Sequence, residues 1–216
     1  ADDSLELFRE HPGPAPHLML ANAHGLVFSR RVRVLARHVS EMLPRNASVL
    51  DVGAGDGMIA RLVLDARPDL TIRGVDVLAR AESHIPVTLF DGATIPHGDG
   101  EFDAAMMVDV LHHAAQQHHL LREMRRVVKR AIVIKDHVVQ GPLARPTLAF
   151  MDWVGNARYG VSLPYSYWTA AQWDQAFADL KLTVADRRTS LGLYPWPASM
   201  LFERGLHFIA RLERAP

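Results

Sequence analysis

The sequence predicts an α/β protein with a doubly wound, mainly parallel β-sheet and helices on both faces. Between residues 44 and 137, short apolar runs alternate with amphipathic stretches, a pattern typical of βαβ units. A glycine-rich loop, residues 53–57, directly follows the first of these runs. The fourth run, residues 102–110, is rich in apolar residues on both faces, as a buried central parallel strand requires.

Composition narrows the class of protein further. The 216 residues form one large domain or two small ones, and 24 basic residues balance 24 acidic ones. A neutral chain is a poor candidate for binding nucleic acid. Cysteine is absent, which excludes disulfides and thiolate chemistry. No apolar run approaches the ~18 residues of a membrane span, and the start lacks signal-peptide features. We therefore expect a soluble, cytoplasmic protein.

The first elements are an arm and a helix. Residues 1–17 are polar and interrupted by prolines, whereas residues 18–43 carry apolar side chains at spacings of three and four until Pro44 ends the pattern. The arginines on its polar face, which include Arg30, Arg31 and Arg33, are expected to lie in solvent, although they could instead meet an anionic acceptor. We treat residues 1–43 as an N-terminal arm and helix and residues 44–216 as the main domain.

The next elements alternate regularly. Each strand is a short apolar run, and each helix has an apolar face with a polar one opposite. The predicted strands are residues 48–52, 71–77, 87–90, 102–110 and 131–135, and the predicted helices are residues 58–66 and 116–129.

The last third differs in composition. Residues 138–168 combine aromatic residues with glycines and prolines, so we expect an insertion that covers the carboxyl edge of the sheet and is helical around 148–157. Thr169 is a suitable N-cap for a helix that reaches Leu180. Two further strands are predicted at 182–187 and 207–212.

The glycine loop indicates the kind of ligand. Glycines let the backbone turn sharply and approach a ligand closely, and the following helix presents free N–H groups to it. Met58 stands where the dinucleotide fingerprint needs glycine, and a Walker A triplet is absent. Asp76 follows Gly57 by 19 residues, the place of an acid that accepts hydrogen bonds from a ribose diol. A nucleoside without a pyrophosphate fits both features, although an ordinary strand-to-helix turn with a solvated aspartate is the alternative.

Three segments together resemble a known family. The loop 51–57, the Gly74-Val75-Asp76 acid and the run from Phe102 to His113 are similar to class I S-adenosylmethionine-dependent methyltransferases, within about residues 30–137. The small-molecule branch that includes quinone C-methyltransferases is the most similar. The resemblance implies a Rossmann-like sheet of seven strands in the order 3-2-1-4-5-7-6, with strand seven antiparallel.

The resemblance also implies roles in binding S-adenosylmethionine. Asp51 would anchor the loop near the methionine ammonium, the loop would pass under the cofactor, and Asp76 would hold the ribose. Asp91 would accept a hydrogen bond from the adenine amine, and Asp109 would lie near the methionine end. The implied cofactor-binding residues are Asp51, Gly53, Ala54, Gly55, Asp76, Val77, Asp91, Gly92 and Asp109.

Histidines supply candidate bases, since an acceptor that carries a proton must lose it. His113 follows the fourth strand and His137 ends the fifth, both at the carboxyl edge, so we interpret them as catalytic and the neighbouring His112 as a substrate contact. The alternative for each is a structural imidazole. The histidines lack the spacing of a helical metal-binding pair, so we expect no metal.

The aromatic insertion supplies candidate substrate contacts. A planar or apolar acceptor could stack on Trp153, Tyr159, Tyr165, Tyr167 or Trp168, or these residues could simply pack the insertion onto the sheet.

The resulting hypothesis is an enzyme that methylates a small organic acceptor. The alternatives are methylation of RNA or protein, and a non-catalytic module that binds the cofactor. The sequence identifies neither the acceptor atom nor the oligomeric state.

Overall fold

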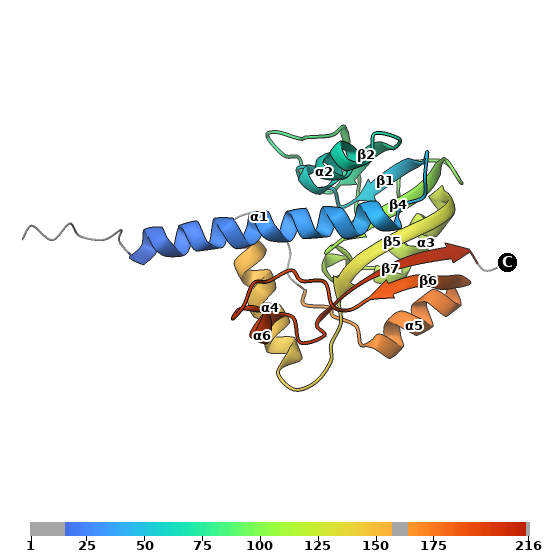
Figure 1. Cartoon of the computed structure of the whole chain (residues 1–216). Helices are drawn as coiled ribbons and strands as arrows, with labels where there is room; N and C mark the ends of the chain where they lie inside the picture. The colour runs from blue at the N-terminus through green and yellow to red at the C-terminus, as the bar shows by residue number, and fades with distance from the viewer. Residues whose placement is uncertain (1–15, 157–163, 215–216) are drawn as a thin grey trace, which may run out of the picture.

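The chain forms one seven-stranded sheet with helices on both faces (Figure 1). The computed structural model describes residues 16–156 and 164–214, of which residues 16–28 are described by their backbone only. The strand order is β3-β2-β1-β4-β5-β7-β6, and β7 runs antiparallel to both of its neighbours. The predicted topology is therefore confirmed. The strands are β1 (Ser48–Val52), β2 (Thr71–Asp76), β3 (Val87–Leu89), β4 (Phe102–Val108), β5 (Val128–His137), β6 (Leu182–Arg188) and β7 (His207–Arg214).

Two helices cover each face of the sheet. On one face, α1 (Pro16–Met42) and α2 (Met58–Ala66) bury apolar side chains such as Val39 and Val63 against alternate residues of β1 and β4. On the other, α3 (Gln117–Val127) and α5 (Ala170–Asp179) do the same with residues such as Leu121 and Phe177. Because helices cover both faces of the parallel strands, the side chains that these strands direct to either face are mostly apolar.

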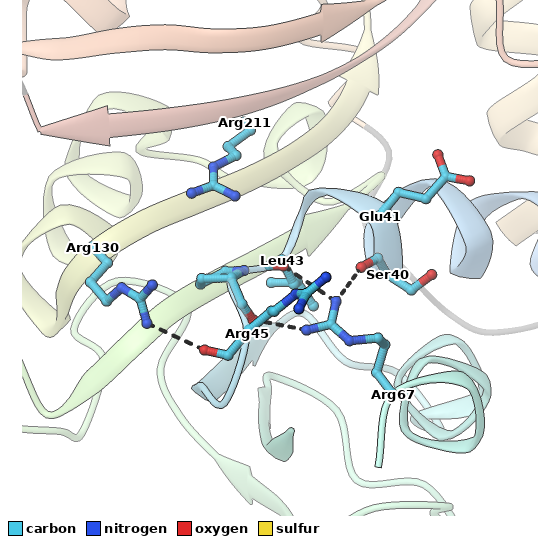
Figure 2. A pocket seen from close by; sticks show the side chains of 8 residues that line it. Ser40, Glu41, Leu43, Arg45, Arg67, Arg130 and Arg211 are labelled. Atoms are coloured by element: carbon cyan, nitrogen blue, oxygen red, sulfur yellow. Dashed lines mark hydrogen bonds between the residues drawn. The ribbon is translucent and has the colours of Figure 1, made fainter. Parts of the chain in front are cut away.

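The helix α1 crosses the sheet and extends beyond it on one side (Figure 1). The last carbonyl groups of a helix lack partners within it, and here two arginines supply them. Arg67 donates a hydrogen bond to the carbonyl oxygen of Ser40 at 2.6 Å (Figure 2). It donates a second one, 3.1 Å long, to the carbonyl oxygen of Pro44, just after the helix. Arg211 donates to that of Met42 at 2.9 Å. These arginines line a surface groove before the start of β1, and their hydrogen bonds explain their position there.

The carboxyl end of the sheet carries three further elements. They are the 3₁₀ turn η1 (Leu111–His113), α4 (Ala144–Asn156) and α6 (Ser199–Phe202). In Figure 1, α4 and α6 lie together below α1, and a small apolar cluster that includes Leu148 and Leu206 holds this region together. The sequence predicted a helix around 148–157, and the structure starts it at Ala144. Neither η1 nor α6 was predicted.

Several predicted boundaries are wrong by a few residues. Residues 128 and 129 belong to β5 rather than to the preceding helix, because Val128 pairs with Phe102 at the start of the sheet. The strand β4 ends at Val108, since Asp109 has a positive φ of 56° that no strand accommodates. The predicted cap of α5 is confirmed: Thr169 and Gln172 form a capping box.

Within the described part of the chain, none of the helices combines the length and the apolar character needed to cross a membrane.

Candidate functional site

The glycine loop follows β1 and turns beneath an open space. Gly53 and Gly57 have φ values of 75° and 76°, and a Cβ on either would clash: 2.4 Å from Val110 Cγ2 at Gly53, and 2.6 Å from Ile85 Cγ1 at Gly57. Gly55 also has a positive φ, 59°, but no described atom lies within 4 Å of the position a Cβ would take there. Two glycines thus allow close packing of the loop, whereas the middle one leaves space for a ligand.

Two buried carboxylates flank this loop. Asp76, the last residue of β2, accepts hydrogen bonds from the backbone N–H groups of Gly55 (2.7 Å) and Leu78 (2.9 Å). Asp51 lies on β1, and burial together with the charge of Asp76 raises its pKa to about 7. The loop, Asp51 and Asp76 are therefore close enough to contact one nucleoside. This fits an adenosyl group with a cationic methionine end.

The other predicted cofactor residues lie around the same edge. The N–H groups of Gly53 and Ala54 donate to the carbonyl oxygen of Val75, at 2.8 and 3.2 Å, which joins the loop to β2. Asp91, after β3, accepts hydrogen bonds from the N–H groups of Ala93 and Thr94.

Val77 and Gly92 are neighbours at this edge. Val77 is exposed, and a Cβ on Gly92, whose φ is 80°, would approach Val77 Cγ1 to 3.0 Å. The structure thus places all the residues predicted to bind the cofactor at the carboxyl ends of β1 to β4, the edge at which open α/β sheets bind ligands.

Asp109 is held in an unusual conformation between two cations. Its φ of 56° lies in the left-handed region, which a non-glycine residue occupies at a cost of about 1–3 kcal/mol. Its carboxylate accepts hydrogen bonds from Arg31 of α1 and Lys135 of β5. Burial disfavours the ionised carboxyl group, but Lys135 and Arg31 outweigh burial and hold the pKa of Asp109 well below its usual range. Arg31 was expected in solvent, and that prediction is wrong because this ion pair draws it inward.

A buried polar cluster fills the space beside Asp109. It contains His112 of η1, Asp136 and His137 of β5, Asp152 of α4 and Tyr167. His112 Nδ1 lies 2.6 Å from Asp136 Oδ1, and His112 Nε2 lies 3.3 Å from Asp152 Oδ2. His137 Nε2 lies 3.4 Å from Asp152 Oδ1, and the Tyr167 hydroxyl donates to Asp152. The two histidines are 2% exposed and Asp152 is 5% exposed.

The two histidines of the cluster titrate in opposite directions. Burial lowers the pKa of an imidazole, but the carboxylates of Asp136 and Asp152 reverse this effect at His112 and raise its pKa to about 10. At His137, burial and the neighbouring charge of Lys135 lower the pKa. Burial also opposes ionisation of Asp152, yet its contacts with His112 and His137 hold the pKa of its carboxyl group below the usual range.

His113 lies at the border of the cluster. It is half-buried, and its ring centroid is 4.0 Å from that of His112. Burial and then the positive charge of His112 lower the pKa of His113. A neutral ring at neutral pH is the form that a general base requires.

The predicted aromatic contacts separate into two groups. Trp153 on α4 and Tyr165 are 57% and 39% exposed, so they are available to a ligand. Trp168 is buried in the core, with its ring against Trp173 and His118. Tyr159 lies outside the described residues.

Sequence reasoning missed four members of the site, Asp136 among them. Asp152 stands in an aromatic segment and reaches the sheet only because α4 folds over it. His207 lies 3.1 Å from His137, ring nitrogen to ring nitrogen, and comes from the far end of the chain. Lys135 is fully buried in β5. It could have been found, because a lysine that ends the apolar run 131–134 has no way to reach solvent from a central strand.

Known proteins share this fold. A family model described as a methyltransferase domain matches residues 26–186. A chain of the complex between the Trm112 methyltransferase activator and a methyltransferase from Haloferax volcanii is 18% identical, with 91% of this chain and 95% of that chain covered and a TM-score of 0.65.

Two further solved structures are similar. The 1,6-didemethyltoxoflavin-N1-methyltransferase of Burkholderia thailandensis, solved with 1,6-didemethyltoxoflavin and S-adenosylhomocysteine, is 17% identical over 96% of this chain and 93% of that chain, with a TM-score of 0.62. A SAM-dependent methyltransferase from Aquifex aeolicus is 16% identical over 85% and 92%, with a TM-score of 0.58. Since the family model covers most of the chain, this protein belongs to the methyltransferase domain family, and it is an enzyme with S-adenosylmethionine as its cofactor.

Proposed function

We propose that this enzyme methylates a small organic acceptor held between the glycine loop and the buried polar cluster. The observation that carries the proposal is the burial of the cluster: His112 and His137 are 2% exposed and Asp152 is 5% exposed. The acceptor would have to approach these enclosed side chains beneath α4, and we expect this of a small molecule rather than of an RNA or protein chain. A small molecule can enter such a site whole.

The residues of the chain have distinct roles in this proposal. S-Adenosylmethionine, when bound, supplies a methyl group on a sulfonium leaving group, so the protein contributes mainly orientation and exclusion of water. Asp76 holds the ribose diol, Asp51 faces the methionine ammonium and Asp91 accepts from the adenine amine. Gly53, Ala54, Gly55, Val77 and Gly92 line the cofactor, and Asp109 lies at its methionine end.

His113 serves as the base when the acceptor carries a proton. Its pKa is lowered, so at neutral pH the ring is in the neutral form that can accept a proton. His137 is the second candidate, since its pKa is also lowered, and His112 contacts the substrate. Trp153, Tyr165 and Tyr159 stack on a flat acceptor, whereas Trp168 has a weaker case because it already packs in the core. A quinone-type ring is one acceptor of this flat kind.

A labelling experiment tests the class of acceptor. The purified enzyme is incubated with a cell extract and S-adenosylmethionine that carries a tritiated methyl group, and the products are separated by ultrafiltration. We expect label in the low-molecular-weight filtrate, and Asp76→Ala should reduce it strongly. Label in precipitated RNA or protein, which α4 would have to open to admit, contradicts the proposal.

A further inference from the structure

The most unusual feature of the buried cluster is a gap faced by three electron-pair donors. One ring nitrogen of His112, one ring nitrogen of His137 and a carboxylate oxygen of Asp152 all lie within 4.8 Å of one another. They come from η1, β5 and α4, three elements that only the tertiary fold brings together. On each histidine ring, the partner of Nδ1 determines which of the two nitrogens carries a hydrogen.

For His112, the partner of Nδ1 is a carboxylate. Nδ1 lies 2.6 Å from Asp136 Oδ1, and a carboxylate can only accept, so the hydrogen is on Nδ1. Nε2 is buried and, among the described residues, makes no hydrogen bond. In the neutral ring this nitrogen therefore presents a lone pair to Asp152, 3.3 Å away.

For His137, the nitrogen that carries the hydrogen is deduced from the hydrogen bonds of the neighbouring His207. Nε2 of His207 lies 2.9 Å from the carbonyl oxygen of Phe202, so it carries the hydrogen. Nδ1 of His207 accepts instead, in agreement with the ammonium of Lys135 at 3.3 Å. His137 Nδ1, 3.1 Å from this acceptor, must then be the donor. Its Nε2 is left with a lone pair that faces Asp152 at 3.4 Å.

Two imidazole lone pairs and a carboxylate repel one another unless a cation lies between them, and in the metal-free chain a proton on His112 can serve as that cation. A metal ion would take the place of this proton. We propose that His112, His137 and Asp152 bind one divalent transition-metal ion of the Zn²⁺ type. Two ligand atoms each about 2.0–2.1 Å from a tetrahedral ion lie roughly 3.3–3.4 Å apart. Each imidazole lies at such a distance from one oxygen of Asp152, Oδ2 for His112 and Oδ1 for His137, so the carboxylate would have to turn to present one oxygen to the ion. Imidazole and carboxylate suit such ions, and a carboxylate behind a ligating histidine, as Asp136 is behind His112, orients the ring.

This site goes beyond the proposed function and does not depend on it. Three protein ligands leave a fourth position open, as in catalytic rather than structural zinc sites. With an ion bound, Nε2 of His137 is unavailable as a base, so the base in the reaction is His113. The prediction of no metal rested on helical spacing of histidines, and these ligands are not on one helix.

Metal binding can be measured without knowing the acceptor. The full chain is treated with a chelator, dialysed and titrated with Zn²⁺ by calorimetry and with Co²⁺ by visible absorption. We expect one ion per chain and cobalt bands of a four- or five-coordinate site. His112→Ala and Asp152→Asn should lower the affinity by more than the 10- to 100-fold that is the approximate cost of losing an outer-shell partner, and Asp136→Asn should fall within that range.

Two controls distinguish binding at this site from binding to surface imidazoles and from loss of the fold. His84→Ala removes an exposed imidazole and should leave binding unchanged. If the triad variants do not fold, crystals of the unaltered chain soaked in Zn²⁺ should show an anomalous peak between the two Nε2 atoms. Failure of the metal-free wild-type chain to bind either ion would mean that a proton occupies the gap, and this would overturn the proposal. Binding of S-adenosylhomocysteine, measured in parallel, reports on the cofactor site separately.

Discussion

One carboxylate oxygen of Asp76 accepts a 2.7 Å hydrogen bond from the backbone N–H of Gly55. The contact joins the end of β2 to the middle of the loop after β1. The same carboxylate is proposed to accept from the ribose, so Asp76 would both shape the loop and bind the ligand. Its second oxygen also accepts a backbone hydrogen bond, from Leu78, so the position of the carboxylate is determined before any ligand arrives.

Replacing Asp76 tests the ribose contact. Asp76→Ala should weaken binding of S-adenosylhomocysteine by about 1–3 kcal/mol, roughly 5- to 150-fold, because polar groups on both sides lose partners. Calorimetry with the purified variant measures this. Asp65→Ala, which alters an exposed carboxylate on α2, is the control. Equal affinity in wild type and Asp76→Ala would remove Asp76 from the binding site.

The pH dependence of binding tests Asp51. Its pKa is about 7 in the free protein, and a bound ammonium would lower it. Binding then releases a proton below pH 7, so affinity for S-adenosylhomocysteine should rise about tenfold from pH 6 to pH 8 and level off above the free-protein pKa. Calorimetry in buffers of different ionisation enthalpy would detect the proton. The dependence should be absent in Asp51→Asn.

The same residue should affect folding with a defined sign. The native pKa of Asp51 is raised above the roughly 3.9 of an unfolded chain, so the folded state binds a proton more tightly and loses this stability as pH rises from about 4 through 7. Asp51→Asn should therefore gain free energy of unfolding relative to wild type at pH 8 but not at pH 4. Urea denaturation of wild type and Asp51→Asn at pH 4 and pH 8 measures this. If the two proteins differed in free energy of unfolding by the same amount at both pH values, the raised pKa of Asp51 would be contradicted.

Two loop glycines should respond differently to the same change. Gly53→Ala combines the cost of a left-handed backbone with that of a clash against Val110. Together they should lower the free energy of unfolding by about 2–6 kcal/mol. Gly55→Ala has the backbone cost alone, about 1–3 kcal/mol. It should fold and yet bind S-adenosylhomocysteine poorly, because its methyl group enters the open space. If Gly55→Ala bound normally, the cofactor would lie elsewhere.

The buried lysine should be important for stability. Lys135→Met removes one of the two cations that pair with Asp109, and breaking such a buried pair costs about 3–5 kcal/mol. Arg61→Met removes an exposed ion pair with Asp65 and should cost about 0.5 kcal/mol or less. Urea denaturation of both variants gives the comparison. If both variants lost only a similar, small amount of free energy of unfolding, Arg31 alone would be sufficient to stabilise the buried charge of Asp109.

The proposed base can be tested once labelling identifies an acceptor. His113→Ala should reduce turnover by about 100- to 10,000-fold, the usual contribution of a positioned base, while S-adenosylhomocysteine affinity changes little. The rate of wild type should fall below the lowered pKa of His113 as the ring gains a proton. Unchanged turnover would mean that alignment alone drives the reaction.

The sequence was most informative where structure depends on neighbours in the chain. Ser48–Val52 and Met58–Ala66 occur as predicted, because an apolar run, a glycine loop and an amphipathic stretch are local signals. The capping box at Thr169 is equally local.

The buried cluster depends on distant contacts instead. Asp152 and His207 approach His137 only after α4 and β7 have packed, and no spacing along the chain relates them. Arg31 shows the same limit, since on a helical wheel it resembles its neighbours Arg30 and Arg33. Only the left-handed turn at Asp109 gives it a partner.

The link between Arg31 and Asp109 has a consequence for protein engineering. Because the first helix supplies a counterion to Asp109, which is proposed to lie at the methionine end of the cofactor, exchanging that helix with one from another methyltransferase would change the surroundings of this carboxylate as well as the packing. A hybrid joined after residue 43 would inherit a foreign residue opposite Asp109, whereas one joined before Arg31 would keep the native counterion.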